Sequence, residues 1–173
     1  RNVLTRRGVC VRGKLRPMRF EHLIEVNAPA VSLQLVIPTF TREQLWRGLL
    51  QRVQQPQNFP MGPQSCDWRE TQPGVYARTL TFGPHTFADT VVVTPYSELV
   101  FTPEAQGDTA PIRLTIRIEE PQAGQMLLRF TYEALAPQSD EERYYNDYRH
   151  NAWLHNDRDM VRTLRQWLSD EGL

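Results

Sequence analysis

The sequence predicts an α+β domain in which a curved antiparallel sheet of seven strands wraps around one long C-terminal helix. One strand pattern and one amphipathic helix pattern come first, and six short strand-like runs follow in a row. The last segment, residues 140–171, contains neither proline nor glycine. Short connections between consecutive strands require antiparallel pairing, and strand twist curves a sheet of this width.

Composition restricts the class of protein. The chain has 173 residues, of which 40% are hydrophobic and 23% charged, values typical of one folded domain and not of a disordered chain. No apolar run approaches the roughly 18 residues of a membrane-spanning helix, so no membrane insertion is expected. The two cysteines, Cys10 and Cys66, show no zinc-ligand spacing and no disulfide framework, which favours a cytoplasmic location.

Charge divides the chain at Met18. Residues 1–17 carry six basic residues and no acid, whereas the remainder carries 14 basic and 20 acidic residues. A basic arm for nucleic acid is one interpretation, but no aromatic residues interleave the charges and the rest of the chain is acidic. We expect residues 1–17 to be a basic leader, non-native or disordered, and residues 18–173 to form a single domain that binds no nucleic acid.

The first elements are a strand and a helix. Residues 20–26 alternate apolar and polar side chains, and Asn27-Ala28-Pro29 ends the strand. After a connection over residues 30–40, Thr41 and Gln44 form a capping box that begins a helix, which Pro56 ends. Residues 58–63 are expected to form a loop or one short helical turn.

Six further strands are predicted over residues 66–71, 75–82, 86–93, 98–103, 112–119 and 125–135. Turn residues such as Gln72-Pro73-Gly74 and Gly83-Pro84-His85 separate them. Within residues 112–118 isoleucine and leucine alternate with arginine and threonine, so one face of the sheet is predicted to be buried and the other wet.

The last helix begins with a second capping box, formed by Ser139 and Glu142. Apolar residues share one face at helical spacing, mostly in its second half: Trp153, Met160, Val161, Leu164, Trp167 and Leu168. Its first half mixes polar and apolar groups on roughly the same face, namely Tyr145, Arg149, Ala152 and Asn156.

Several segments carry a resemblance to a known superfamily. They are residues 20–27, residues 35–38 leading into Thr41-Arg42-Glu43-Gln44-Leu45-Trp46-Arg47-Gly48-Leu49, Ile118-Glu119-Glu120-Pro121, and residues 128–133. With the strand order, they make residues 18–173 resemble the SRPBCC or START-like helix-grip superfamily, which includes birch-pollen-allergen-like proteins, and more narrowly its AtaL branch. The resemblance implies a hydrophobic or amphipathic cavity between sheet and helix. It implies no particular chemistry, because the superfamily hosts several functions on one scaffold.

Charged residues fall at inward-facing strand positions. Suppose the Gly83-Pro84-His85 turn pairs Phe82 with Phe87, and the Gln72-Pro73-Gly74 turn pairs Glu70 with Tyr76. Then Glu70, Arg78 and Asp89 lie on the concave face, with Arg78 diagonal to each acid. One interpretation is a polar anchor for a ligand head group, because an isolated buried charge needs compensation. The alternatives are a structural ion pair at the sheet edge, or a register that turns the charges outward.

The aromatic residues in the first half of the last helix fit either a cavity lining or a core. We therefore expect the cavity to draw on the inward strand positions and on this half of the helix. The candidate ligand-binding residues are Glu70, Tyr76, Arg78, Phe82, Phe87, Asp89, Phe130, Tyr145, Arg149, Trp153 and Asn156.

No catalytic or cofactor motif accompanies these residues. His150 and His155 are five positions apart, His22 has no partner that the sequence shows, and neither a phosphate-binding glycine loop nor a G-x-S-x-G motif is present. We expect no metal and no cofactor. The favoured function is binding of a small lipid-, aromatic- or polyketide-like ligand. The alternatives are a cyclase or aromatase in which Arg78, Asp89 and Glu70 position the substrate, and an interaction module with a collapsed cavity; the oligomeric state stays open.

Overall fold

The computed structural model describes residues 16–29, 38–170 and 172–173. Most of the predicted basic leader, with Cys10, lies outside the described residues, as does the 35–37 part of the resemblance motif. Met18 is described, and its carbonyl accepts a hydrogen bond of 2.9 Å from the N–H of Ala134 in the last strand.

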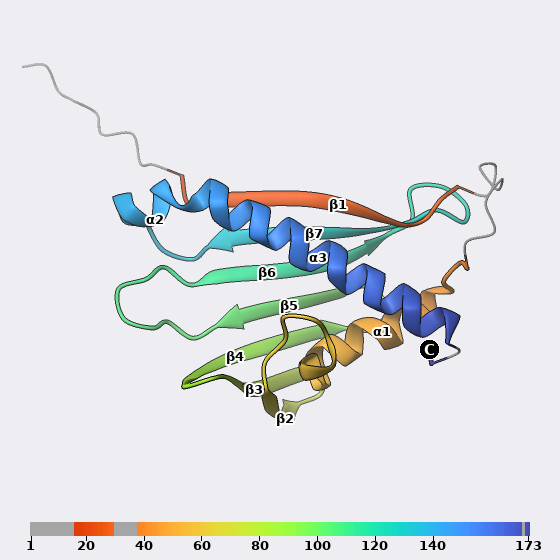
Figure 1. The fold of residues 1–173 in the computed structure, drawn as a ribbon, viewed down its shortest axis with the longest axis horizontal. Coiled ribbons are helices and arrows are strands. Elements are labelled where there is room, and N and C mark those ends of the chain that lie inside the picture. The colour runs from red at the N-terminus through yellow and green to blue at the C-terminus, as the bar shows by residue number, and fades with distance from the viewer. Residues whose placement is uncertain (1–15, 30–37, 171) are drawn as a thin grey trace, which may run out of the picture.

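Seven antiparallel strands form one sheet in the order β1-β7-β6-β5-β4-β3-β2 (Figure 1). The strands are β1 (Arg19–Asn27), β2 (Ser65–Gln72), β3 (Val75–Phe82), β4 (His85–Thr94), β5 (Glu98–Pro103), β6 (Ile112–Glu119) and β7 (Met126–Ala134). β2 to β7 follow one another as a meander, and β1 completes the sheet by pairing with β7. The predicted fold class is confirmed.

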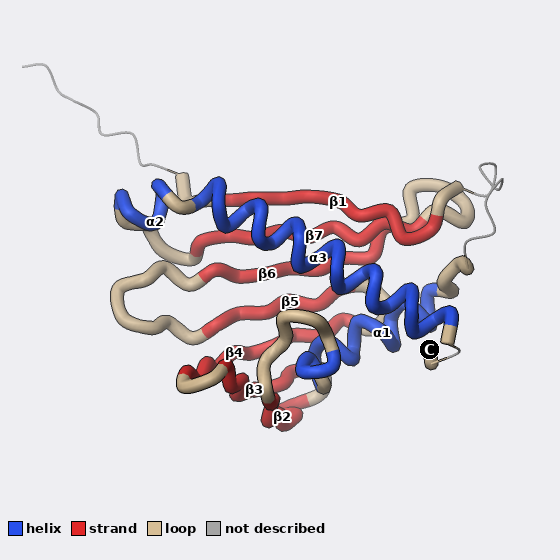
Figure 2. The backbone as a smooth tube through the Cα atoms, in the orientation of Figure 1, coloured by secondary structure: helices blue, strands red, loops and turns tan. Residues whose placement is uncertain are grey.

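The helices lie on one face of this sheet, as the tube in Figure 2 shows. α1 (Arg42–Gln54) begins at the predicted capping box, in which the Thr41 side chain accepts from the N–H of Gln44. Its residues Leu45, Leu49 and Val53 are fully buried. The short 3-10 helix η2 (Pro56–Asn58) follows, and residues 59–64 lead from it into β2.

The C-terminal helix is divided, which corrects the prediction of one uninterrupted helix. α2 (Asp140–Tyr144) and α3 (Asn146–Ser169) meet at Tyr145, whose φ of −89° and ψ of 0° depart from helical geometry. The Glu142 carboxylate accepts a 2.8 Å hydrogen bond from the N–H of Ala110, in the connection between β5 and β6. This long-range bond holds α2 to the β5–β6 connection, whereas α3 packs across the sheet.

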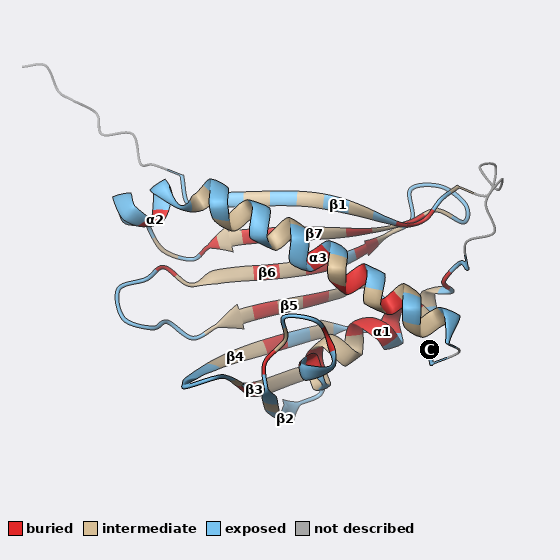
Figure 3. Ribbon diagram, in the orientation of Figure 1, coloured by how far each residue is buried: buried red, intermediate tan, exposed pale blue. Residues whose placement is uncertain are grey.

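The core lies between the sheet and the second half of α3, where buried residues concentrate (Figure 3). Met160, Val161 and Leu164 form the buried face of α3. α1 approaches this face closely at Gly48, because a Cβ added there would lie 2.6 Å from Leu164 Cδ2. The predicted apolar face of the helix is therefore the one that packs in the core.

The hairpin between β3 and β4 has a different register from the prediction. Phe82 pairs with His85, Leu80 with Phe87, and Arg78 with Asp89. The turn contains only two residues, Gly83 and Pro84, and Gly83 adopts a φ of 56°, which glycine tolerates readily. The shift is two residues, so each side chain keeps its predicted face and Arg78 lies directly opposite Asp89.

Glu142 is expected to make stability sensitive to acid. Hydrogen bonds from the N–H groups of Ser139 and Ala110 to its carboxylate lower its pKa below the usual value of a glutamate. A pKa lower in the folded than in the unfolded state stabilises the fold above the unfolded pKa, and this contribution is lost as pH falls through the folded pKa. Glu142→Gln should therefore have a lower melting temperature than the wild-type protein at pH 7. The difference between the two melting temperatures should become smaller as the pH is lowered toward 3.

Thermal melts of the Glu142→Gln variant across this pH range test the expectation. Glu141→Gln is the matched control, because Glu141 is an exposed neighbour whose side chain makes no hydrogen bond among the described residues. If the melting temperatures of the two variants depend on pH in the same way, the hydrogen bonds from Ala110 and Ser139 to Glu142 are not the cause of the acid sensitivity.

Candidate functional site

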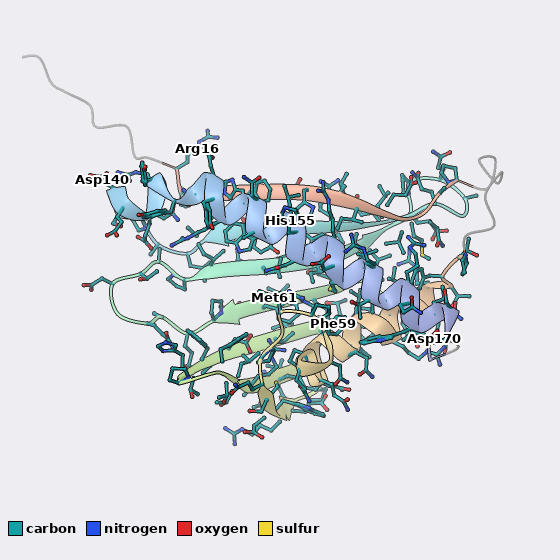
Figure 4. All side chains as sticks on the ribbon, in the orientation of Figure 1. Arg16, Phe59, Met61, Asp140, His155 and Asp170 are labelled. Atoms are coloured by element: carbon teal, nitrogen blue, oxygen red, sulfur yellow. The ribbon has the colours of Figure 1, made fainter. Side chains whose placement is uncertain are left out.

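A cavity of about 270 Å³ lies between the concave face of the sheet and α3, beside the loop that precedes β2. Strand residues, the end of α1 and two α3 residues form its walls. Figure 4 labels Phe59 and Met61 on this loop, in front of the sheet. The lining residues are Arg52, Pro56, Phe59, Pro60, Met61, Gly62, Pro63, Arg78, Leu80, Phe82, Asp89, Phe101, Pro103, Ile112, Leu114, Asn156 and Met160.

The cavity is bounded by both exposed and buried side chains. Met61 is 77% exposed and Phe82 38% exposed, whereas Phe59, Leu114 and Met160 are buried. Most of the lining is apolar, and the polar groups are few, as in sites for small organic molecules.

Arg78 and Asp89 form a buried ion pair on the strand side of the cavity. Arg78 Nε donates to Asp89 Oδ1 at 2.8 Å and Nη2 donates to Oδ2 at 2.6 Å, a bidentate arrangement. Arg78 Nη1 donates to the carbonyls of Arg52 and Val53 at 3.0 and 2.9 Å. These carbonyls belong to the last turn of α1, so Arg78 joins the sheet to the end of that helix.

Phe101 lies below two arginine side chains. The Cζ atom of Arg78 is 5.1 Å from the centre of its ring, and that of Arg52 is 5.9 Å from it. Both distances are within the range of a cation–π interaction. Among the described residues, the guanidinium of Arg52 makes no hydrogen bond or ion pair, in contrast to that of Arg78.

Four of the candidate ligand-binding residues line this cavity: Arg78, Phe82, Asp89 and Asn156. Arg78 is buried, with 6% exposure, and lies on the concave face. An outward-facing Arg78, one of the alternatives considered from the sequence, is therefore wrong. Their part in binding a ligand stays a prediction.

The other seven candidates lie elsewhere. Glu70 is exposed and accepts a hydrogen bond from the N–H of Gly74, so it takes no part in the Arg78–Asp89 pair. Tyr76 packs edge-on against Trp68, and Phe87 packs against Phe82, which lines the cavity. Phe130 and Trp153 stack on His22 and Tyr132, whereas Tyr145 is exposed and Arg149 half-buried.

Several lining residues were missed from the sequence. Leu80, Phe101 and Leu114 each lie two positions from another inward-facing residue of the same strand. The alternation of side chains along a strand could therefore have identified them. Phe59 and Met61 lie in a proline-rich loop without periodicity, so only the way in which the loop packs over the sheet brings them to the cavity.

A second buried polar cluster joins α3 to β1 and β7. Asp157 is fully buried, and its Oδ2 lies 2.7 Å from His22 Nε2 and accepts a 2.7 Å hydrogen bond from the hydroxyl of Tyr132. Burial and the neighbouring Asp157 charge raise the pKa of Tyr132. The sequence did not show this partner of His22, which is separated from it by 135 positions. None of the three side chains lines the cavity.

Comparison with known proteins identifies the family. The model of the family described as AtaL, acetylaranotin biosynthesis cluster protein L, matches residues 24–171. The chain belongs to the AtaL family. No curated protein matches this AtaL-family chain.

Solved structures with the same fold include aromatase/cyclases. The di-domain ARO/CYC StfQ from the steffimycin biosynthetic pathway is similar, with a TM-score of 0.61, 12% identity, and coverage of 90% of this chain and 52% of StfQ. The Zhui aromatase/cyclase from a Streptomyces species has a TM-score of 0.58 and 11% identity, covering 88% of this chain and 96% of Zhui. The AtaL-family chain thus spans about half the length of StfQ.

The fold is shared with Ara h 8.0201 as well, with a TM-score of 0.53 and 12% identity over 89% of this chain and 98% of that protein. These similarities establish the helix-grip fold of the AtaL-family chain. In the part of the chain that the structure describes, no helix has both the length and the apolar character needed to cross a membrane.

Proposed function

We propose that this AtaL-family protein binds a small lipid-, aromatic- or polyketide-like ligand in the cavity between the sheet and α3. The observation that carries the proposal is the cavity itself, about 270 Å³ in volume and lined mainly by apolar side chains. Ligand pockets usually measure roughly 300–1,000 Å³, so this cavity lies just below that range and suits a small ligand. An apolar cavity of about 150 Å³ already holds benzene.

Because the cavity is open, a ligand-binding protein is favoured over an interaction module whose cavity has collapsed. An enzyme of the cyclase or aromatase kind is the second candidate. Two observations favour it: the Arg78–Asp89 pair reaches the cavity wall, and StfQ and Zhui, which share the fold, are described as aromatase/cyclases. Binding is preferred because the lining offers no nucleophile paired with a base.

Native mass spectrometry of the protein purified from its own cells is the first test. We expect an additional mass that disappears when the protein is denatured, which identifies the ligand by its mass. Incubation with a linear poly-β-ketone then separates the candidates, because an enzyme converts it to an aromatic product, whereas a carrier returns it unchanged.

Filling the cavity should abolish binding. Leu80→Trp adds bulk at a lining position, and we expect affinity for the neutral aromatic probe 2-naphthamide to fall at least about tenfold, since the ring occupies the same space. Isothermal titration calorimetry measures this affinity, and circular dichroism checks that the variant is folded.

Val92→Trp is the matched control, because Val92 is 44% exposed, lies on the neighbouring strand and does not line the cavity. It should bind 2-naphthamide as wild type does. Equal affinities for Leu80→Trp and wild type would place binding elsewhere in the molecule.

A further inference from the structure

The cavity carries an unbalanced positive charge. Three of its lining residues are ionisable, two arginines and one carboxylate: Arg52, Arg78 and Asp89. Both oxygens of Asp89 are engaged by Arg78, at 2.8 and 2.6 Å. Arg78 and Asp89 therefore compensate each other, and the charge of Arg52 remains.

Arg52 is held at the cavity by the surrounding structure. It lies in the last turn of α1, its carbonyl accepts a hydrogen bond from Arg78, and its guanidinium lies over Phe101. The side chain is half-buried, and no carboxylate of the described residues pairs with it. A guanidinium stays charged at any ordinary pH, and a partly desolvated charge favours an opposite charge beside it.

The other residues that line the cavity restrict which kind of ligand can supply the negative charge. Phe59, Leu114 and Met160 give the cavity a buried apolar wall. A carboxylate on a flat apolar body would satisfy both parts of the site, because a guanidinium fork matches the two carboxylate oxygens. The volume of about 270 Å³ has room for one or two fused rings, given that about 150 Å³ holds benzene.

We propose that the ligand of this cavity is an aromatic carboxylate of one or two rings, whose carboxylate pairs with the guanidinium of Arg52. This proposal rests on the proposed binding function and specifies the charge and size of its ligand. Arg78 is less suited than Arg52 to recognise the carboxylate, because hydrogen bonds to Asp89 and to two carbonyls of α1 take up all but one of its N–H donors.

The test compares 2-naphthoate with its neutral analogue 2-naphthamide by isothermal titration calorimetry. The two probes share the ring system and differ in charge, so the ratio of their affinities reports the anion preference. In the wild-type protein we expect 2-naphthoate to bind at least about tenfold more tightly, the usual effect of one charge-assisted hydrogen-bonded pair.

Variants of Arg52 assign the preference to this residue. Arg52→Met keeps an apolar stem over Phe101 and removes the charge, so the affinity ratio should fall to within about twofold of one. Arg52→Lys keeps the charge and should retain part of the preference. Arg47→Met is the control, because Arg47 is an exposed arginine of the same helix that does not line the cavity. The ratio of 2-naphthoate to 2-naphthamide affinity in this variant should equal that of the wild-type protein.

The outcomes separate this inference from the proposed function. If the wild-type protein binds 2-naphthamide as tightly as 2-naphthoate, the inference is wrong and the binding function stands. If the preference survives in Arg52→Met, another group recognises the anion and the inference is again wrong. If neither probe binds, both the inference and the proposed cavity function are overturned.

Discussion

Arg78→Met is expected to lower the free energy of unfolding by about 3–5 kcal/mol, the usual cost of removing one partner of a buried ion pair. The substitution keeps much of the side-chain volume but leaves the Asp89 carboxylate, which is only 11% exposed, without its cation. The carbonyls of Arg52 and Val53 lose their donor as well. Both losses act in the same direction, because each leaves a desolvated polar group unpaired.

Denaturant unfolding of the Arg78→Met variant and of the double variant Arg78→Met/Asp89→Asn measures the effect. Removing the uncompensated charge in the double variant should recover part of the lost stability, and Asp89→Asn alone should destabilise the protein. A loss below about 1 kcal/mol for Arg78→Met, together with an affinity for 2-naphthoate at least about tenfold weaker, would instead make Arg78 a ligand anchor in a wet cavity.

Leu164→Ala is expected to cost about 2–5 kcal/mol of stability, because it removes a fully buried side chain and leaves a cavity. Leu164 lies on the buried face of α3, where Gly48 of α1 approaches it closely. The second half of α3 is thus the part of the helix that fastens it to the rest of the domain. Equilibrium unfolding measures the change, and a loss below about 0.5 kcal/mol would mean that this face is not a core contact.

Gly48 provides a sharper version of the Leu164 experiment. In the wild-type protein, a methyl group at this position would lie 2.6 Å from Leu164 Cδ2, so Gly48→Ala forces the leucine to move. In the Leu164→Ala background the same methyl enters vacated space and improves helix propensity by up to about 1 kcal/mol. Gly48→Ala should therefore change the free energy of unfolding more favourably in the Leu164→Ala background than in the wild-type protein. If the effects of the two substitutions simply add, Gly48 and Leu164 are not in contact.

The sequence by itself determined the order of the elements and most of their bounds. Residues 75–82, 98–103 and 112–119 form strands as predicted, and α1 begins at the Thr41–Gln44 capping box. These features depend on alternation, turn residues and caps, which act between neighbours in the chain and are therefore visible in it. Inward and outward faces were predictable too, because a register shift of two residues leaves them unchanged.

Only the tertiary structure decided which of the inward residues meet. The two-residue turn at Gly83-Pro84 placed Arg78 opposite Asp89, and the packing of α1 brought the carbonyls of Arg52 and Val53 to the same guanidinium. The last helix is divided at Tyr145, the N–H of Ala110 bonds to Glu142 in its first part, and the partner of His22 lies 135 positions away in α3. These contacts join segments far apart in sequence, where the geometry of turns and packing, and not local pattern, determines which side chains are neighbours.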